Sequence, residues 1–370
     1  MAISVTVVGA GAFGGWTALH LLRAGCKVTL VDAWGPGHSR SSSGDETRVI
    51  RGAYGPNAIY TQMVARAIPM WQESQRRWGV KMFEQCGALW MAGPPDDSYE
   101  KAAVENIRAT GMRFEEVSAA DGQRRWPQMS WDGVDWAIYE PDGGFLFARR
   151  ACQAVVDAFM AEGGTYRQER IDPGAIRGGG HWVFACGPWL GQLFPEELGA
   201  LITPTRQEAF YFGPPAGDTR MSEAHFPAWV DKPTRYYGIP GNEWRGFKVA
   251  LDIPGAPVDP TTLERRASDQ ALTGARAYVA RRYPLLRDAP VIESRVCQYE
   301  MTPDGDLIVD RLPGRENAWV VGGGSGHGFK LGPALGEMVA NMVSGEAAVE
   351  PRFALARFAG KTFTSVGERK

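Results

Sequence analysis

The sequence predicts a mixed α/β protein with two domains, and three observations carry that prediction. The chain has 370 residues, which is long for one compact domain and comfortable for two. Residues 5–32 have the order of a strand, a glycine-rich turn, a helix and a second strand, which is how a doubly wound sheet begins. Two later stretches, 81–143 and 206–299, are richer in aromatic and turn residues, and we expect them to pair into a mostly antiparallel sheet.

The composition is that of an ordinary soluble globular protein. Hydrophobic residues make up 44% of the chain and charged residues 22%, and the formal net charge is −2. Without a basic field or a run of like charges, nucleic acid and anionic membranes are not expected partners. No window reaches the roughly 18 apolar residues of a membrane helix, and a signal-peptide pattern is missing. The five cysteines lack zinc spacing, so we expect no metal site and a reducing, cytoplasmic location.

The start of the chain carries a nucleotide-binding motif. A β-branched run at residues 5–8 leads directly into the sequence GAGAFG, and the next apolar strand ends in Asp32. Gly9 allows the tight turn, Gly11 lets the backbone approach a pyrophosphate, and Gly14 lets the helix pack closely on the strand. The helix N-terminus attracts the phosphates, and Asp32 is placed to accept hydrogen bonds from the ribose hydroxyls. The motif therefore predicts a Rossmann-like dinucleotide-binding domain.

Asp32 disfavours the 2′-phosphate of NADP but leaves NAD and FAD open, because both carry ADP. Distant segments decide between them. The sequences GDETRVIR, TPTRQE, YYGIPGNEWRGFKVALD, RVCQYEMTPDGDLIVD and GGGSGHGFKLGPALGE follow GAGAFG in that order and extend over nearly the whole chain. With these segments the chain resembles the FAD-dependent amine oxidases of the D-amino acid oxidase superfamily, above all the group of monomeric sarcosine oxidase and N-methyltryptophan oxidase.

The resemblance implies how the chain is divided. A discontinuous, Rossmann-like FAD-binding domain would comprise residues 1–80, 144–205 and 300–370. Residues 81–143 and 206–299 would form the substrate domain, whose mostly antiparallel sheet roofs the flavin.

The resemblance also implies which residues contact the cofactor. The loop SGHGFK would bring backbone amides close to the flavin ring, with His327 as a hydrogen-bond donor. The helix after this loop would point its N-terminus at the pyrimidine end of the ring. The alternative is a glycine-rich turn that touches no ligand. The expected cofactor-binding residues are Gly9, Gly11, Gly14, Asp32, Arg48, Ile171, Cys297, Gly324, Gly326, His327 and Gly328.

Between residues 164 and 182 the chain departs from the family. Its sequence there, TYRQERIDPGAIRGGGHW, is shorter than the usual hairpin and is expected to be too short for the family's strands. An apolar residue near Ile171 touches the adenine in the family. The run at residues 178–180 reads as a flexible bridge, so the departure concerns the adenine side and not the chemistry at the ring.

Five residues are expected to serve the reaction. By resemblance, Arg51 and Lys330 bind the substrate carboxylate, one as a bidentate fork and the other as a point charge. Lys248 would lie on the opposite flavin face, hold a water and stabilise superoxide as electrons pass to O₂. Tyr299 would line the pocket, and Asp252 stands where the sarcosine oxidases have a histidine facing the substrate. The structural alternatives are a surface ion pair for Arg51, a solvated loop residue for Lys330, an edge-strand lysine for Lys248, a strand end for Asp252 and ordinary packing for Tyr299.

Cys297 reads as the attachment point of the flavin. A thiolate can add to the 8α-methyl group of the isoalloxazine, and it needs access and a nearby positive charge, for which Arg295 is one source. The resemblance places Cys297 at the covalent link of the family. The alternative is a free cysteine that acts as a small buried hydrophobe, which suits the other four cysteines.

The sequence leaves more than one function open. The first is the oxidation of a small secondary amine or N-methyl amino acid to an imine, with O₂ reduced to H₂O₂ and the protein a monomer or weak homo-oligomer. A dehydrogenase variant would pass the electrons to another acceptor. The second is a flavin-binding protein without turnover. An NAD-dependent dehydrogenase is disfavoured, because a nicotinamide site does not need Cys297 or the SGHGFK loop.

Overall fold

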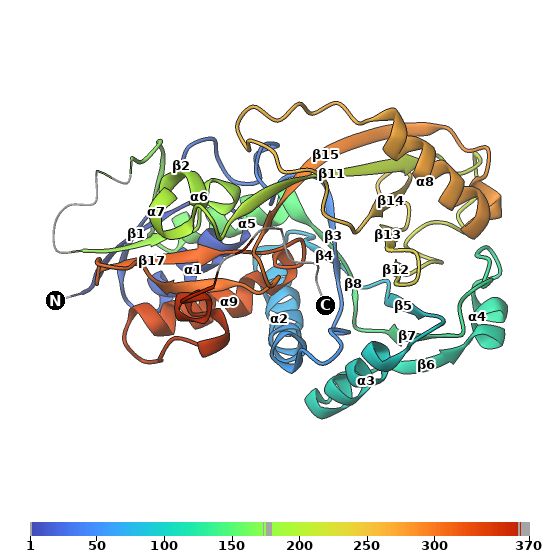
Figure 1. Cartoon of the computed structure of the whole chain (residues 1–370), viewed down its shortest axis with the longest axis horizontal. Helices are drawn as coiled ribbons and strands as arrows, with labels where there is room; N and C mark the ends of the chain where they lie inside the picture. Colours follow the sequence, from blue (N-terminus) through green and yellow to red (C-terminus); the bar gives the residue numbers. More distant parts are fainter. Residues whose placement is uncertain (1, 173, 175–179, 362, 364–370) are drawn as a thin grey trace.

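The computed structural model describes residues 2–172, 174, 180–361 and 363 (Figure 1). Their strands form a six-stranded sheet, an eight-stranded sheet and a small three-stranded sheet. Two long strands, β11 (Thr203–Phe212) and β15 (Val291–Met301), run from the side of the first sheet into the second, as Figure 1 shows.

The six-stranded sheet carries the nucleotide-binding motif. In spatial order its strands are β16 (Ile308–Arg311), β17 (Ala318–Gly322), β10 (His181–Phe184), β1 (Ser4–Val8), β2 (Lys27–Asp32) and β9 (Thr165–Gln168). Five of them are parallel, and β16 is antiparallel to β17. Parallel strands need helical crossovers, so helices cover both faces of this sheet.

Side-chain alternation along the strands separates two cores. Val7, Leu30 and Val183 lie in register and are buried under the helices α1, α2, α5 and α9. Val8 and Phe184 belong to the core on the opposite face, under α6 and α7. The bounds are α1 (Ala12–Arg23), α2 (Ala58–Trp78), α5 (Ala148–Ala161), α6 (Leu190–Leu193), α7 (Pro195–Leu198) and α9 (Gly332–Val343).

The eight-stranded sheet is antiparallel except where β5 pairs with β12. In spatial order it comprises β15, β11, β14 (Phe247–Leu251), β13 (Tyr236–Ile239), β12 (Ala228–Asp231), β5 (Ala88–Ala92), β7 (Trp136–Glu140) and β6 (Glu115–Ser118). The helices near it are α3 (Ser98–Thr110), α4 (Ala119–Arg125) and α8 (Asp269–Arg282). Tyr278 of α8 stacks on Trp229 of β12, which anchors this helix to the sheet.

The remaining elements are short. The small sheet consists of β3 (Thr47–Ile50), β8 (Gly144–Phe147) and β4 (Phe83–Glu84). The 3₁₀ helices are η2 (Gly187–Trp189), η3 (Pro284–Leu286), η4 (Phe329–Leu331), η5 (Pro351–Phe353) and η6 (Leu355–Phe358). The helix η4 leads directly into α9, so the glycine-rich loop before it lies at the entry to a helix.

The predicted fold class is confirmed: a mostly parallel sheet covered by helices is joined to a mostly antiparallel sheet. The residue ranges assigned to two domains stay a prediction. The segment between residues 164 and 182, expected to be too short for the family's strands, holds the four-residue strand β9. This strand pairs with β2 at the edge of the sheet, with Tyr166 opposite Leu30. Residues 178 and 179 of the expected bridge lie outside the described residues.

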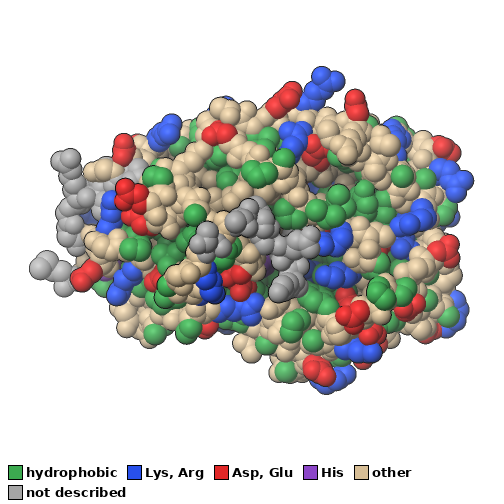
Figure 2. Space-filling view, in the orientation of Figure 1, with side chains coloured by type: hydrophobic (Ala, Val, Ile, Leu, Met, Phe, Trp, Pro, Cys, Tyr) green, Lys and Arg blue, Asp and Glu red, His purple; other side chains and the backbone are tan. Residues whose placement is uncertain are grey.

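The surface and the helix lengths add two findings. Figure 2 shows Lys and Arg interspersed with Asp and Glu over the visible face, with apolar side chains between them. In the part of the chain that the structure describes, no helix is long and apolar enough to cross a membrane.

Candidate active site

A large cavity is lined by residues of both larger sheets and of the loops between them. The predicted residues that line it are Gly9, Gly11, Asp32, Arg48, Arg51, Ile171, Asp252, Cys297, Tyr299, Gly324, Gly326, His327, Gly328 and Lys330. In the described part of the chain, this wall does not include the two other predicted residues, Gly14 and Lys248. The structure thus brings together residues from one end of the chain to the other.

The first glycine turn approaches the wall too closely for side chains. Gly9 has φ +106°, and a Cβ there would lie 2.3 Å from the carbonyl oxygen of Ala185. A Cβ on Gly11, which lines the cavity, would lie 3.0 Å from Ser43 Oγ. Gly14 packs behind the turn, where a Cβ would lie 1.8 Å from the carbonyl oxygen of Gly9. This close approach is what the packing role expected of Gly14 requires, and its part in cofactor binding stays a prediction.

Asp32 ends β2 beside this turn and fixes it. Its Oδ2 accepts a hydrogen bond of 2.7 Å from the backbone N–H of Ala10, and Oδ1 accepts from Trp34 and Gly35 at 2.8 Å each. Carboxylate oxygens accept more than one hydrogen bond, so Asp32 keeps capacity towards a ligand in the cavity.

Polar atoms along the wall favour a polar ligand. Ser42 Oγ, Gln298 Oε1 and Glu300 Oε2 are buried and lack hydrogen-bond partners among the described residues. Buried polar groups without partners are destabilising. The acceptor oxygens of Gln298 and Glu300 are suited to hydroxyl groups of a nucleotide cofactor, and the Ser42 hydroxyl can donate to a phosphate oxygen. Burial raises the pKa of the Glu300 carboxyl to about 7, although it accepts from the Gly324 N–H at 3.1 Å.

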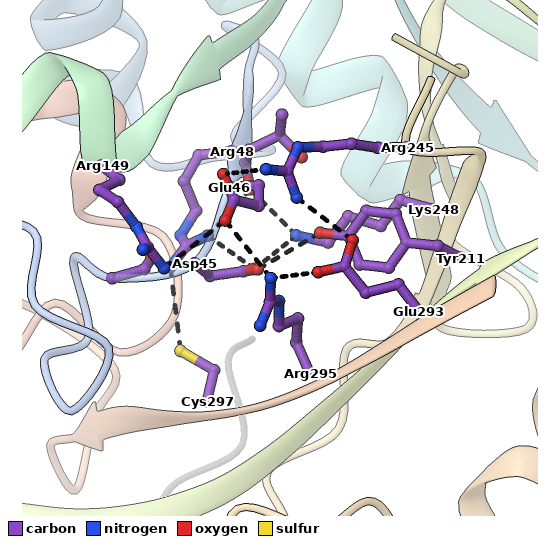
Figure 3. Close-up of polar contacts among 12 residues, drawn as sticks. Asp45, Glu46, Arg48, Arg149, Tyr211, Arg245, Lys248, Glu293, Arg295 and Cys297 are labelled. Atoms are coloured by element: carbon purple, nitrogen blue, oxygen red, sulfur yellow. Dashed lines mark hydrogen bonds and ion pairs between the residues drawn. The ribbon is translucent and has the colours of Figure 1, made fainter. Parts of the chain in front are cut away.

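A guanidinium group lies beside the thiol of Cys297 (Figure 3). The distance from Arg48 Nη2 to Cys297 Sγ is 3.8 Å. The same nitrogen donates to the carbonyl oxygens of Ser42 and Gly44 at 2.8 and 2.6 Å, so the loop holds the cation in place. Arg295, which the sequence suggested as the nearby charge, pairs instead with Glu293 and Glu46.

Lys248 lies behind the cavity wall, in an ion pair with Asp45 (Figure 3). Its Nζ donates to Asp45 Oδ2 at 2.7 Å and to the carbonyl oxygen of Thr47 at 3.1 Å. Burial lowers the pKa of Lys248, and the charge of Asp45 opposes that effect. Burial would raise the pKa of Asp45, but Lys248 and Arg48 hold it well below its ordinary value. The ammonium therefore has a fixed counter-charge between itself and the cavity, because Asp45 lines the wall.

A second cavity opens from the first at Arg51, Val230, Asp252 and His327, which line both. The Arg51 guanidinium lies 4.2 Å from the ring centre of Trp90. Arg51 also donates to the carbonyl oxygen of Ala53. This stacking leaves a flat, oriented cation at the junction of the two cavities.

Lys330 adds a second positive charge near this junction. Its Nζ donates to Tyr54 Oη and to the carbonyl oxygen of His327, both at 2.8 Å. The ring centre of Tyr54 also lies 4.7 Å from the Arg51 guanidinium, so this tyrosine contacts both Lys330 and Arg51. The His327 ring contacts the carbonyl oxygen of Gly305 at 3.0 Å through Nε2.

Two tyrosines and a carboxylate form a chain along the opposite wall. Tyr299 Oη donates to Asp252 Oδ1 at 3.3 Å and lies 3.5 Å from Tyr237 Oη. All three residues line the first cavity. Asp252 therefore belongs to the wall at which the two cavities meet, and not to a solvent-facing strand end.

Sequence reasoning missed several residues of this site. Ser42, Asp45, Gln298 and Glu300 line the cavity without having been singled out. Asp45 and Ser42 lie in the loop that contains Arg48, and Gln298 and Glu300 lie next to Cys297 and Tyr299, so proximity in the sequence was the available signal. Ile171, which was predicted, lines the cavity and packs, partly buried, against the core under α6 and α7.

The comparisons agree with this geometry. The profile of the FAD dependent oxidoreductase family (DAO) matches residues 4–342. The N-methyl-L-tryptophan oxidases of Yersinia pestis (strain Pestoides F) and Yersinia pseudotuberculosis (serotype O:1b, strain IP 31758) are each 28% identical over 358 residues, covering 92% of this chain and 94% of theirs.

Solved structures share the fold. L-Proline dehydrogenase from P. horikoshii superposes with a TM-score of 0.82 at 19% identity, over 96% of this chain and 98% of that one. An Amadoriase I mutant from Aspergillus fumigatus gives 0.78 at 18% identity, over 96% and 90%.

A mostly parallel sheet whose first glycine turn lines a large cavity is the architecture of a dinucleotide-binding protein. The chain belongs to the FAD dependent oxidoreductase family. The predicted family, enzyme class and use of FAD are thereby confirmed.

Proposed function

We propose that this protein oxidises a small secondary amine, in particular an N-methyl amino acid, to an imine. The observation that carries the proposal is the pair of cations at the junction of the cavities, Arg51 and Lys330. A guanidinium and an ammonium held from different directions suit a carboxylate. The names of the Yersinia relatives, which specify an N-methyl amino acid, support the same substrate class.

The roles of the residues follow from their places on the wall. FAD, when bound, would supply the acceptor for a hydride equivalent from the carbon beside the amine nitrogen. Arg51 and Lys330 hold the carboxylate, and the carboxylate of Asp252 orients the amine from the other wall. The substrate loses two electrons and two protons, O₂ takes them up as H₂O₂, and water hydrolyses the released imine. Gly9, Gly11, Asp32 and the 324–328 loop are the proposed cofactor contacts.

One observation favours an electron acceptor other than O₂. The ammonium of Lys248 is bound to Asp45 and stands behind the cavity wall, so its charge is already neutralised. A neutralised cation stabilises superoxide less than a free one. The alternative proposal is therefore a dehydrogenase that passes electrons to a carrier other than O₂.

The function is tested by supplying N-methyl amino acids to the purified holoprotein and recording oxygen uptake, peroxide and, without oxygen, reduction of an artificial electron acceptor. Uptake with peroxide supports the oxidase, and acceptor reduction without uptake supports the dehydrogenase. Arg51→Met is expected to lower kcat/KM about 100-fold, because it removes a buried charge from the carboxylate. Arg311→Met is the control, since Arg311 stacks on Trp319 at 4.7 Å and lines neither cavity. No reduction of either acceptor with any substrate would refute the proposal.

We further propose that Cys297 links covalently to the 8α-methyl group of the flavin. The position of Cys297 on the cavity wall, with the Arg48 guanidinium 3.8 Å from its Sγ, supports it. Acid precipitation of the holoprotein is expected to leave yellow colour in the pellet, and Cys297→Ser is expected to move it to the supernatant. Cys186→Ser is the matched control, because Cys186 also lines the cavity while burial raises the pKa of its thiol. Colour retained in the Cys297→Ser pellet would exclude this link.

A further inference from the structure

The second cavity extends the site beyond the place where the amine is proposed to react. Arg51 and Asp252 stand at its junction with the flavin cavity. Lys232 and Arg235 line the second cavity and not the first. A ligand held at the junction can therefore reach these two cations only with its part that points away from the flavin.

A rigid turn carries both cations. Lys232 and Arg235 lie between β12 and β13, next to Asp231, whose carboxylate is completely buried. This carboxylate pairs with Arg282 at 3.0 Å and accepts a hydrogen bond from Tyr278 Oη at 3.0 Å. The N–H of Asp252 donates to the carbonyl oxygen of Arg235 at 2.7 Å, which ties the turn to the end of β14. The turn thus presents its cations without a flexible backbone.

Lys232 lacks a counter-charge in contact. Among the described residues its ammonium makes no ion pair, and it lies 4.5 Å from the ring centre of Tyr99. Burial lowers the pKa of Lys232, and the charges of Arg235 and Arg51 lower it further, against the opposing charges of Glu100 and Asp252. An anion bound beside this ammonium would relieve both the burial and the repulsion.

The acids that line the second cavity are engaged elsewhere. Asp304 and Asp306 pair with Arg357 and Arg352, each at 2.8 to 2.9 Å. The Asp252 carboxylate accepts from Tyr299, and its backbone carbonyl oxygen accepts from Arg235 at 3.2 Å. The three cations Arg51, Lys232 and Arg235 therefore face one carboxylate.

We propose that Lys232 and Arg235 form a second anion subsite, and that the substrate is an N-alkyl amino acid with a second carboxylate. One carboxylate binds Arg51 and Lys330, the amine lies near Asp252, and the other carboxylate binds the turn. In this arrangement each charged group of the ligand faces residues of opposite charge along the two cavities. The assignment of the reacting amine rests on the proposed function, while the anion subsite rests on the cavity alone.

Binding tests the subsite without turnover. Holoprotein is titrated with glutarate and with glutaramate, its monoamide, and the flavin absorbance change gives each Kd. Glutarate is expected to bind about 10- to 100-fold more tightly, because its second carboxylate contacts a charged group. Lys232→Gln should abolish most of that ratio and Lys232→Arg should keep it. Lys27→Gln, at an exposed lysine that lines neither cavity, should leave it unchanged. Equal affinities of wild-type protein for the two ligands would overturn the subsite.

Measurements of turnover test the anion subsite and the proposed amine oxidation separately. With N-methyl-L-glutamate and N-methyl-L-glutamine as substrates, kcat/KM is expected to favour the acid by the same factor, and Lys232→Gln to reduce that preference. Oxidation of both at equal kcat/KM would refute the subsite and leave the amine oxidation standing. Preferential binding of glutarate with no oxidation of any N-methyl amino acid would support the subsite and refute the proposed function.

Discussion

Replacing Gly14 with alanine is expected to deprive the protein of its FAD and much of its stability. The new Cβ would lie 1.8 Å from the carbonyl oxygen of Gly9 and 3.1 Å from Ala185 Cβ. The turn cannot move aside easily, because the N–H of Gly9 donates to the carbonyl oxygen of Val31 at 2.7 Å. Overpacking of this kind destabilises by about 3 kcal/mol, and here it would also displace the backbone that lines the cavity.

The neighbouring glycine supplies the control. Gly15 lies in the same helix, and its added Cβ would lie 3.3 Å from Val155 Cγ1, a side-chain atom that can shift. Alanine is favoured over glycine inside a helix by about 1 kcal/mol, so Gly15→Ala should bind FAD and melt at or above the wild-type temperature. The ratio of flavin to protein absorbance and the melting midpoint measure both variants. A yellow Gly14→Ala protein with the wild-type midpoint would contradict the packing argument.

The parts of the fold that the sequence predicted are those determined by local order. The packing role of Gly14 was expected from the spacing of glycines within one strand–helix unit, and the structure leaves no room for a Cβ there. The mixed α/β class follows from the same unit and from the composition of two later stretches. The strand β9 was missed, because four residues at a sheet edge carry little periodicity of their own.

The contacts that could not be predicted join distant segments. Arg48 contacts Cys297 across 249 positions, whereas sequence proximity suggested Arg295. The turn that holds Lys232 reaches the second cavity because β12 pairs in parallel with β5, a partner that no local pattern indicates. A motif predicts which charged residues line a site. Which residues of opposite charge they contact depends on how distant strands pair.

Lys248 illustrates the same limit within a motif. The resemblance implied a lysine facing the flavin, and the structure pairs its ammonium with Asp45, 203 positions away. The sequence does not show which acid neutralises a buried lysine. Whether Lys248 acts on O₂ therefore stays a prediction, and its behaviour depends on Asp45.

Asp45→Asn is expected to destabilise the protein by about 3 kcal/mol, because it leaves the buried Lys248 and the partly buried Arg48 without their carboxylate. Asp45 accepts from Lys248 at 2.7 Å, from Arg48 at 3.1 Å and from Tyr211 Oη at 3.3 Å (Figure 3). Asparagine has the same shape and tolerates the φ of +69° found here, so the substitution removes charge with little backbone strain. Lys248 can relieve part of the loss by releasing its proton, since burial already lowers its pKa.

The pH dependence distinguishes this charge effect from a packing effect. The folded-state pKa of Asp45 lies below its ordinary value of 3.8, so its contribution to stability is fully present above that value and is lost as the pH falls towards the folded-state pKa. The difference in melting midpoint between wild type and Asp45→Asn should therefore shrink below about pH 4, where Asp45 of the wild type takes up a proton. It should also shrink as the pH rises to the point at which Lys248 of the variant releases its proton. Glu73→Gln, in the exposed pair with Arg76, should change the midpoint much less at every pH. A wild-type midpoint for Asp45→Asn at neutral pH would mean that Lys248 and Arg48 do not need this carboxylate, and that the ammonium is available to the flavin after all.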